Sequence, residues 1–114
     1  MFECNSSKYE YVNYTAVTAL TKGQLVAVND VFGFPIKDLA IGETGIIITK
    51  CEAKAKKNET VAIPSGSAVY YNSANSNIDL TATGDLVGAS RDSSLAADTH
   101  VVINFDGFSA FLKA

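Results

Sequence analysis

One histidine and two cysteines are the side chains in this sequence best suited to chemistry. His100 lies between Thr99 and Val101 with no G-x-S-x-G serine to pair with it, which favours a structural or exposed strand histidine. Cys4 and Cys51 stand 47 positions apart. A disulfide between them is geometrically possible, but a reducing cytoplasm disfavours it, and the spacing is not that of a metal site. We therefore predict no catalytic residue, no cofactor and no metal.

Phosphate loops and carboxylate pairs are not found either. Neither G-x-x-x-x-G-K-[ST] nor G-x-G-x-x-G occurs, and the nearest run, Gly42-Glu43-Thr44-Gly45, carries an acid where phosphate needs bare backbone amides. Asp and Glu residues are scattered singly, usually beside Gly, Thr or Asn, which is typical of turns. The sequence thus argues against an enzyme.

The composition predicts one compact domain. The 114 residues are 47% hydrophobic and carry a formal net charge of −3, from 9 Lys+Arg and 12 Asp+Glu, which favours a globular chain over a disordered one. The acidic balance argues against nucleic acid as a partner. No apolar run approaches the roughly 20 residues that span a bilayer, and the first residues lack the order of a signal peptide. We expect no membrane association and residence in the cytoplasm where the chain is made.

The elements that must position any site are strands. Val, Ile and Thr make up 27 of the 114 residues, and these β-branched side chains favour strands over helices. Ser93–Ala97 is long enough for one helical turn only. Short apolar or alternating runs bounded by turn residues predict strands at Gln24–Asn29, Val31–Phe34, Gly45–Ala55, Ser67–Asn72, Ile78–Thr81, Leu86–Ser90 and Thr99–Phe105, with Tyr9–Thr18 as a further candidate.

The third of these strands alternates strictly in its second half. Cys51, Ala53 and Ala55 fall on one face, and the opposite face carries Lys50, Glu52, Lys54 and Lys56. Small residues inside and charges outside predict a strand that leaves the core for an exposed edge, where lysines discourage pairing with a stray strand.

Two parts of the chain resemble each other. Val31-Phe32-Gly33-Phe34, followed by Glu43-Thr44 and an apolar triplet, recurs 55 residues later as Leu86-Val87-Gly88-Ala89, followed by Asp98-Thr99 and another triplet. Upstream, Leu20–Gly23 recurs at an offset of 43, as Ile63–Gly66, so the second unit carries a 12-residue insertion around residues 72–84. We expect an all-β fold, a small barrel or sandwich of two duplicated three-stranded units at about 20–48 and 63–103.

Four glycines are expected to shape these units. Gly23 and Gly66 are predicted to supply turns with φ > 0, and Gly33 and Gly88 to mark bulges or sharp bends. Outside the units we expect extended termini, so that residues 1–14 form an N-terminal arm, 15–105 the β domain and 106–114 a C-terminal tail.

The termini are rich in aromatic residues, which bury large areas with few rotatable bonds. They pack either on the protein's own core or on a partner, and the sequence leaves both alternatives open. As candidates for contact with a partner or a second subunit we select Phe2, Tyr9, Tyr11, Tyr14, Phe108 and Phe111.

Four segments together resemble the small capsid cement or head decoration proteins of tailed phages. They are TALTKGQLVAVNDVFGFPIKDLAIGETGIII at 18–48, IPSGSAVYYNSAN at 63–75, TATGDLVGAS at 81–90, and the strand Asp98–Ile103. The resemblance covers roughly residues 15 to 105. Pro35-Ile36 and Ala97-Asp98 depart from the family pattern, which usually has small residues and a Gly-Asp turn there.

The resemblance implies a structural virion protein that binds the major capsid protein on the outer surface of the shell and bridges capsomers. It also implies a homo-trimer, present in the host cytoplasm during assembly and afterwards in the virion. The alternative is a small β-barrel adaptor that binds peptides through a groove or strand edge.

Overall fold

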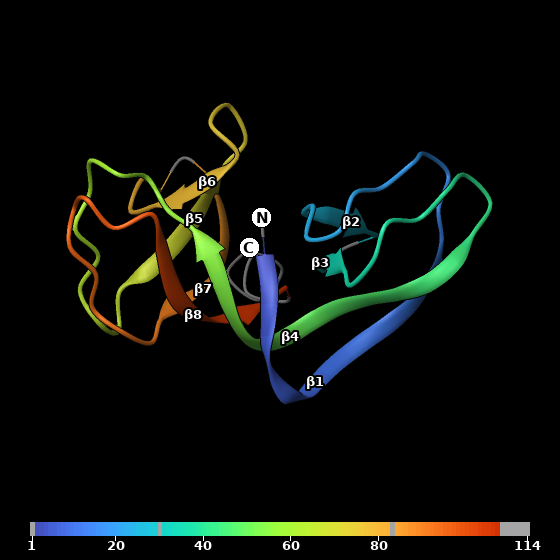
Figure 1. Ribbon diagram of the computed structural model, residues 1–114, viewed down its shortest axis with the longest axis horizontal. Helices are drawn as coiled ribbons and strands as arrows, with labels where there is room; N and C mark the ends of the chain where they lie inside the picture. Colours follow the sequence, from blue (N-terminus) through green and yellow to red (C-terminus); the bar gives the residue numbers. More distant parts are fainter. Residues whose placement is uncertain (1, 30, 83, 108–114) are drawn as a thin grey trace.

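The structure, a computed structural model, describes residues 2–29, 31–82 and 84–107, and it is all-β over these ranges (Figure 1). Every predicted strand overlaps an observed one, which confirms the all-β class. Ser93–Ala97, which is long enough for one helical turn, lies instead in a loop that holds a tight turn closed from the Asp98 N–H to the Leu95 carbonyl. The strands are β1 (Phe2–Thr15), β2 (Val26–Val28), β3 (Val31–Pro35), β4 (Thr44–Lys56), β5 (Ala68–Asn72), β6 (Asn77–Asp79), β7 (Asp85–Ser90) and β8 (His100–Asp106).

The long strand β4 organises the molecule. One of its edges pairs with β1 throughout, and its other edge pairs first with β3 and then with β8. The sheet order is β2-β3-β4-β8-β7-β5-β6, with β1 off this path. Figure 1 shows β1 and β4 side by side through a sharp bend, with β2 and β3 on one arm and β5–β8 on the other. We call residues 11–49 lobe one, and residues 50–106 with the start of β1 lobe two.

The bend coincides with irregular pairing between β1 and β4. The register shifts between Cys4 and Tyr9, and again between Glu10 and Tyr11. Extra residues on one strand of a pair increase its local twist and bend it, as a β-bulge does. The N-terminal residues predicted to form an arm are therefore a bent strand of the sheet, paired with the longest central strand.

The predicted alternation in β4 is present, but its predicted place at an edge is wrong. Cys51, Ala53 and Ala55 are buried, while the charged residues between them face outward. Lys54 lies between Glu3 of β1 and Val102 of β8, so β4 is paired on both sides there. The alternation predicts which face of β4 is exposed to solvent, but it does not predict whether other strands pair with both edges of β4.

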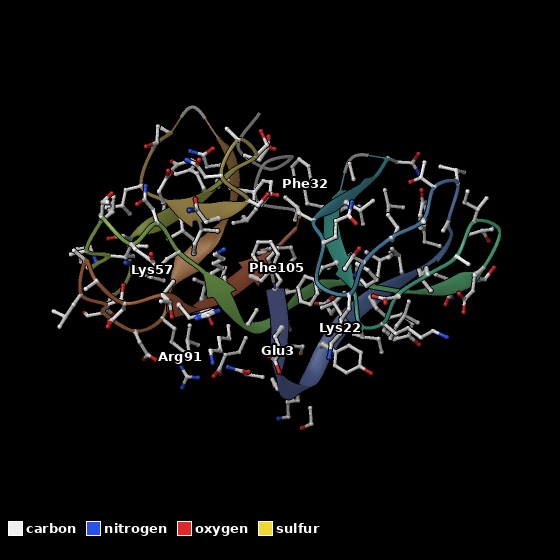
Figure 2. The ribbon with its side chains drawn as sticks, turned by 45° about the horizontal axis from the view of Figure 1, so that its top comes forward. Glu3, Lys22, Phe32, Lys57, Arg91 and Phe105 are labelled. Atoms are coloured by element: carbon white, nitrogen blue, oxygen red, sulfur yellow. The ribbon has the colours of Figure 1, made fainter. Side chains whose placement is uncertain are left out.

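The core joins the two lobes through three phenylalanine rings. Phe2 stacks on Phe34 with ring centroids 5.5 Å apart, and Phe105 lies 5.1 Å from each of them. Figure 2 shows Phe105 at the centre of the molecule, between the lobes. The main core continues into lobe two through buried aliphatic side chains, and a smaller cluster in lobe one consists of Ala16, Leu20, Leu39 and Ile47.

The same backbone hydrogen bonds occur within each of the two units, between residues related by the offsets seen in the sequence, 43 and 55 residues. Leu20 and Leu39 exchange two backbone hydrogen bonds, and Ile63 and Ser94 do the same. In addition, the Gly23 N–H donates to the Pro35 carbonyl, and in the second unit the Gly66 N–H donates to the Ser90 carbonyl. The two units therefore close their loops in the same way.

Of the glycines expected to shape the units, Gly23 and Gly66 have φ of 80° and 83°, and Gly88 has φ of 145°. The β5–β7 register shifts beside Gly88, between Val69 and Tyr70. Gly33 pairs in regular register with Val26, and a Cβ there would collide with Ile47. Gly33 is therefore required by close packing, and the β2–β3 register beside it is regular, without the predicted bulge.

Candidate interaction surfaces

The aromatic residues of the first strand separate into buried and exposed groups. Phe2 is buried in the protein's own core, which is one of the two alternatives left open for the termini. Its side chain is therefore not accessible to a partner. Tyr14 is half-buried against the smaller cluster of lobe one. Tyr9 and Tyr11 are exposed, with ring centroids 6.0 Å apart. Phe108 and Phe111 lie outside the described residues.

A groove of about 750 Å³ opens beside Tyr9 and is lined by residues of lobe two. Small residues of β5 and β7, Ala68, Gly88 and Ala89, contribute to its lining, so the absence of bulky side chains there leaves it open. Charged residues also line it, namely Lys8, Glu10, Lys50, Glu52 and Asp106. An apolar patch surrounded by charged groups is the usual make-up of a protein-binding surface.

The free edge of β1 lies next to this groove. Among the described residues, no strand pairs with the edge of residues 3–15 that faces away from β4. An unpaired edge offers backbone donors and acceptors to another strand, and charged side chains along it limit unwanted pairing. Glu3, Lys8 and Glu10 provide such charges here.

A buried ammonium group, which the sequence reasoning did not identify, lies inside lobe two (Figure 2). Lys57 is fully buried, and its Nζ donates hydrogen bonds of 2.8 to 3.0 Å to backbone carbonyls only, those of Asn58, Leu95, Ala96 and Asp98. A buried charge needs such complete hydrogen bonding because desolvation is costly. The alternation of β4 contained the signal, since Lys57 continues the inward series Cys51, Ala53, Ala55.

The histidine that the sequence analysis weighed for catalysis lies in a strand. His100 is exposed at the start of β8, and its Nδ1 lies 2.9 Å from the Thr99 hydroxyl. Within residues 2–29, 31–82 and 84–107, no group of three or more His, Cys, Asp and Glu is arranged to hold a metal ion.

The two cysteines are free thiols in neighbouring strands. The Cys4 thiol donates to the Ser6 carbonyl at 3.2 Å. Burial raises the pKa of the Cys51 thiol, and the neighbouring Cys4 raises it further. A raised pKa leaves little thiolate at neutral pH, and the thiolate is the nucleophilic form, so Cys51 is suited to packing and not to reaction.

These features describe an all-β protein with exposed aromatic and apolar surfaces. The model of one protein family, described as phage cement protein, matches residues 6–105. The chain belongs to this family, and its role is structural, as a component of the phage virion that binds the capsid. No curated protein and no solved structure matches the chain. The described residues include no helix that is long and apolar enough to cross a membrane.

Proposed function

We propose that the protein binds the outer surface of a phage capsid, contacts the major capsid protein and stabilises the shell by bridging neighbouring capsomers. Family membership over residues 6–105 is the observation that carries this proposal. A subunit that touches two capsomers at once makes its second contact intramolecular, so two modest contacts add up to strong retention. The protein resides in the host cytoplasm during assembly and joins the shell afterwards.

The surface around Tyr9 is the proposed contact between subunits in a homo-trimer. Tyr9 and Tyr11 supply exposed aromatic area, the neighbouring groove can receive side chains, and the free edge of β1 can supply backbone hydrogen bonds. Phe108 and Phe111 are assigned to the same class of contacts, to a subunit or to the shell, from the sequence alone. Light scattering coupled to size exclusion tests the trimer. The Tyr9→Ser/Tyr11→Ser variant should shift the mass toward the monomer, whereas Leu80→Ser, on another exposed surface, should not.

No catalytic step is part of this function. His100 is exposed at the start of β8, and within the described residues its hydrogen bond is to the neighbouring Thr99 hydroxyl, so we assign it no general-base role. Replacing His100 with Gln should leave shell binding and thermal stability unchanged.

The groove beside Tyr9 is the one observation that favours the alternative, a peptide-binding adaptor. One binding experiment distinguishes the shell function from the adaptor function. Purified protein is mixed with mature heads that lack it, and bound copies are counted after sedimentation. Saturable binding at a fixed number of copies per head supports the shell function, whereas a monomer without saturable binding overturns it and leaves the adaptor.

A further inference from the structure

The last strand, β8, ends where the sheet leaves it no room to continue. Gly107 follows β8 and is buried, with its N–H donating to the Thr49 carbonyl at 2.7 Å and its carbonyl accepting from the Phe32 N–H at 3.0 Å. A Cβ at this position would collide with the Phe32 carbonyl oxygen. The next place along this edge of β4, opposite Ile48, is taken by Phe34 of β3. The edge of β4 therefore has no place for a continuation of β8 beyond Gly107.

The seven residues after Gly107 are rich in large apolar side chains. Phe108, Phe111 and Leu112 are three of residues 108–114, and Lys113 is the one charged side chain among them. Apolar area of this kind is favourably removed from water by a receiving surface. A surface that suits the segment combines apolar area with acidic groups.

The groove beside Tyr9 has both properties. Its volume of about 750 Å³ lies within the range of about 300 to 1,000 Å³ of pockets that enclose ligands, so it has room for several side chains. Its apolar lining includes Ala68 and Leu86. Acidic groups outnumber basic ones in the lining, with Glu10, Glu52 and Asp106 against Lys8 and Lys50. The groove thus matches residues 108–114 in apolar character and in sign of charge.

The end of β8 points the chain away from the groove of its own copy. Although Asp106 lines the groove, the next residue, Gly107, is held against Phe32 of β3. Tyr9 lies in the bend of β1, between the two register shifts. Figure 1 shows this bend of β1 and β4 on the side of the molecule away from β2 and β3. A segment that leaves the sheet at β3 is therefore better placed for the groove of another copy than for its own.

We infer that residues 108–114 of one copy bind in the groove beside Tyr9 of the next copy, with the Phe108 and Phe111 rings against its apolar lining. The inference rests on the proposed function, and it names the contact that holds the homo-trimer together. Each copy donates one segment and offers one groove, so the contact is heterologous, and such contacts form a closed ring where the rotation between copies allows it. The exposed Tyr9 and Tyr11 rings then lie at each joint of the ring.

Crosslinking tests which copy supplies the groove. A photoreactive benzophenone side chain is placed at position 111, the purified protein is irradiated, and the products are separated on a denaturing gel. We expect a covalent dimer or trimer whose crosslinked peptide contains residues 8–10, 50–52 or 86–89. A product that keeps the mass of a single chain would overturn the inference, because the segment then binds within its own copy. A crosslink between copies at residues outside the groove would overturn it as well.

Two variants test the contact from its two sides. Phe108→Ser/Phe111→Ser removes both rings from the segment, and Ala68→Trp fills the groove from an exposed position. Burying one large apolar side chain changes affinity by about tenfold to a hundredfold, so either variant should raise the concentration at which the trimer dissociates by at least about tenfold. Ser109→Ala and Ala97→Trp are the matched controls, and both should dissociate as the wild type does. Light scattering across a dilution series gives these concentrations, and far-ultraviolet circular dichroism shows that each variant keeps the β fold.

The outcomes separate this inference from the proposed function. If the wild type is a monomer, the homo-trimer of the proposed function fails and this contact fails with it. If the wild type is a trimer and both variants dissociate as it does, the trimer stands and only the contact between residues 108–114 and the groove is wrong. Binding of the wild type to heads is measured apart from both, so the shell function is judged independently.

Discussion

The Nζ atom of Lys57 lies 3.0 Å from the carbonyl oxygen of Leu95, 38 residues away in the sequence, and the lysine is fully buried while the leucine is 73% exposed. This contact joins the residue that follows the central strand β4 to the turn at residues 95–98 in lobe two. The positive charge is solvated by backbone carbonyls in place of water.

Replacement of Lys57 with Met should therefore be strongly destabilising. The methionine keeps most of the aliphatic volume but leaves several buried carbonyls without donors, each costing about 1 to 3 kcal/mol. We expect a loss of about 3 kcal/mol or more in the free energy of unfolding, measured by urea denaturation. Lys56→Met, at the neighbouring exposed position, should change it by about 0.5 kcal/mol or less. Equal effects of the two variants would contradict the structural role of the ammonium.

Phe2 gives a test of the N-terminal strand. If residues 2–15 are part of the sheet, Phe2→Ala removes a ring from the three-phenylalanine core and should cost about 3 to 5 kcal/mol. Tyr11→Ala, on an exposed part of the same strand, should cost about 1 kcal/mol or less. The free energies come from chemical denaturation, and an unchanged stability of the Phe2 variant would show that the segment is a detached arm.

The turn at residues 40–43 in lobe one should respond to acid, because the Glu43 carboxylate accepts a hydrogen bond from the Ala40 N–H at 3.0 Å. The backbone N–H of Ala40, followed by the side chain of Lys37, lowers the pKa of Glu43 below its ordinary value of 4.5. The ionised carboxylate is thus favoured by the fold, and its stabilisation is present above about pH 4.5 and is lost as the pH falls through the lowered pKa. Wild type should melt at a higher temperature than Glu43→Gln at pH 7, and the difference should shrink toward pH 3. A difference that grows on acidification has the wrong sign for this account.

The bend at Gly88 predicts a difference between two glycines that both have positive φ. A Cβ at Gly88 would collide with the carbonyl oxygen of Asn104, whereas nothing lies within 4 Å of a Cβ at Gly66. Gly66→Ala should cost about 1 to 2 kcal/mol from its backbone conformation alone. Gly88→Ala should cost more than about 3 kcal/mol, because the clash adds to the strain. Unfolding by guanidinium measures both, and similar values would show that the β7–β8 contact can relax.

Much of the fold could be predicted from the sequence because local patterns determine strands. The alternation at residues 51–55 and the acid–threonine pairs at 43–44 and 98–99 recurred as real features of the structure. The first half of β1 was missed, because the run around Asn5 to Lys8 is polar and shows no apolar alternation, and because residues 2–4 pair with a distant segment, at 53–55. Pairing between strands far apart in the sequence leaves little local signal.

The candidate surfaces were only partly predictable. Tyr9 and Tyr11 were selected from the sequence and are exposed, but Phe2 was selected by the same reasoning and is buried. Residue type alone does not distinguish a core ring from a surface ring.

The central claim, that this chain holds a phage shell together, is tested most directly by the temperature at which mature heads release their DNA. Heads without the protein are compared with the same heads after saturation with it, with dye fluorescence reporting exposed DNA. A release temperature that rises with the number of bound copies and then levels off is expected. Saturable binding that leaves the release temperature unchanged would show that the protein coats the shell without reinforcing it.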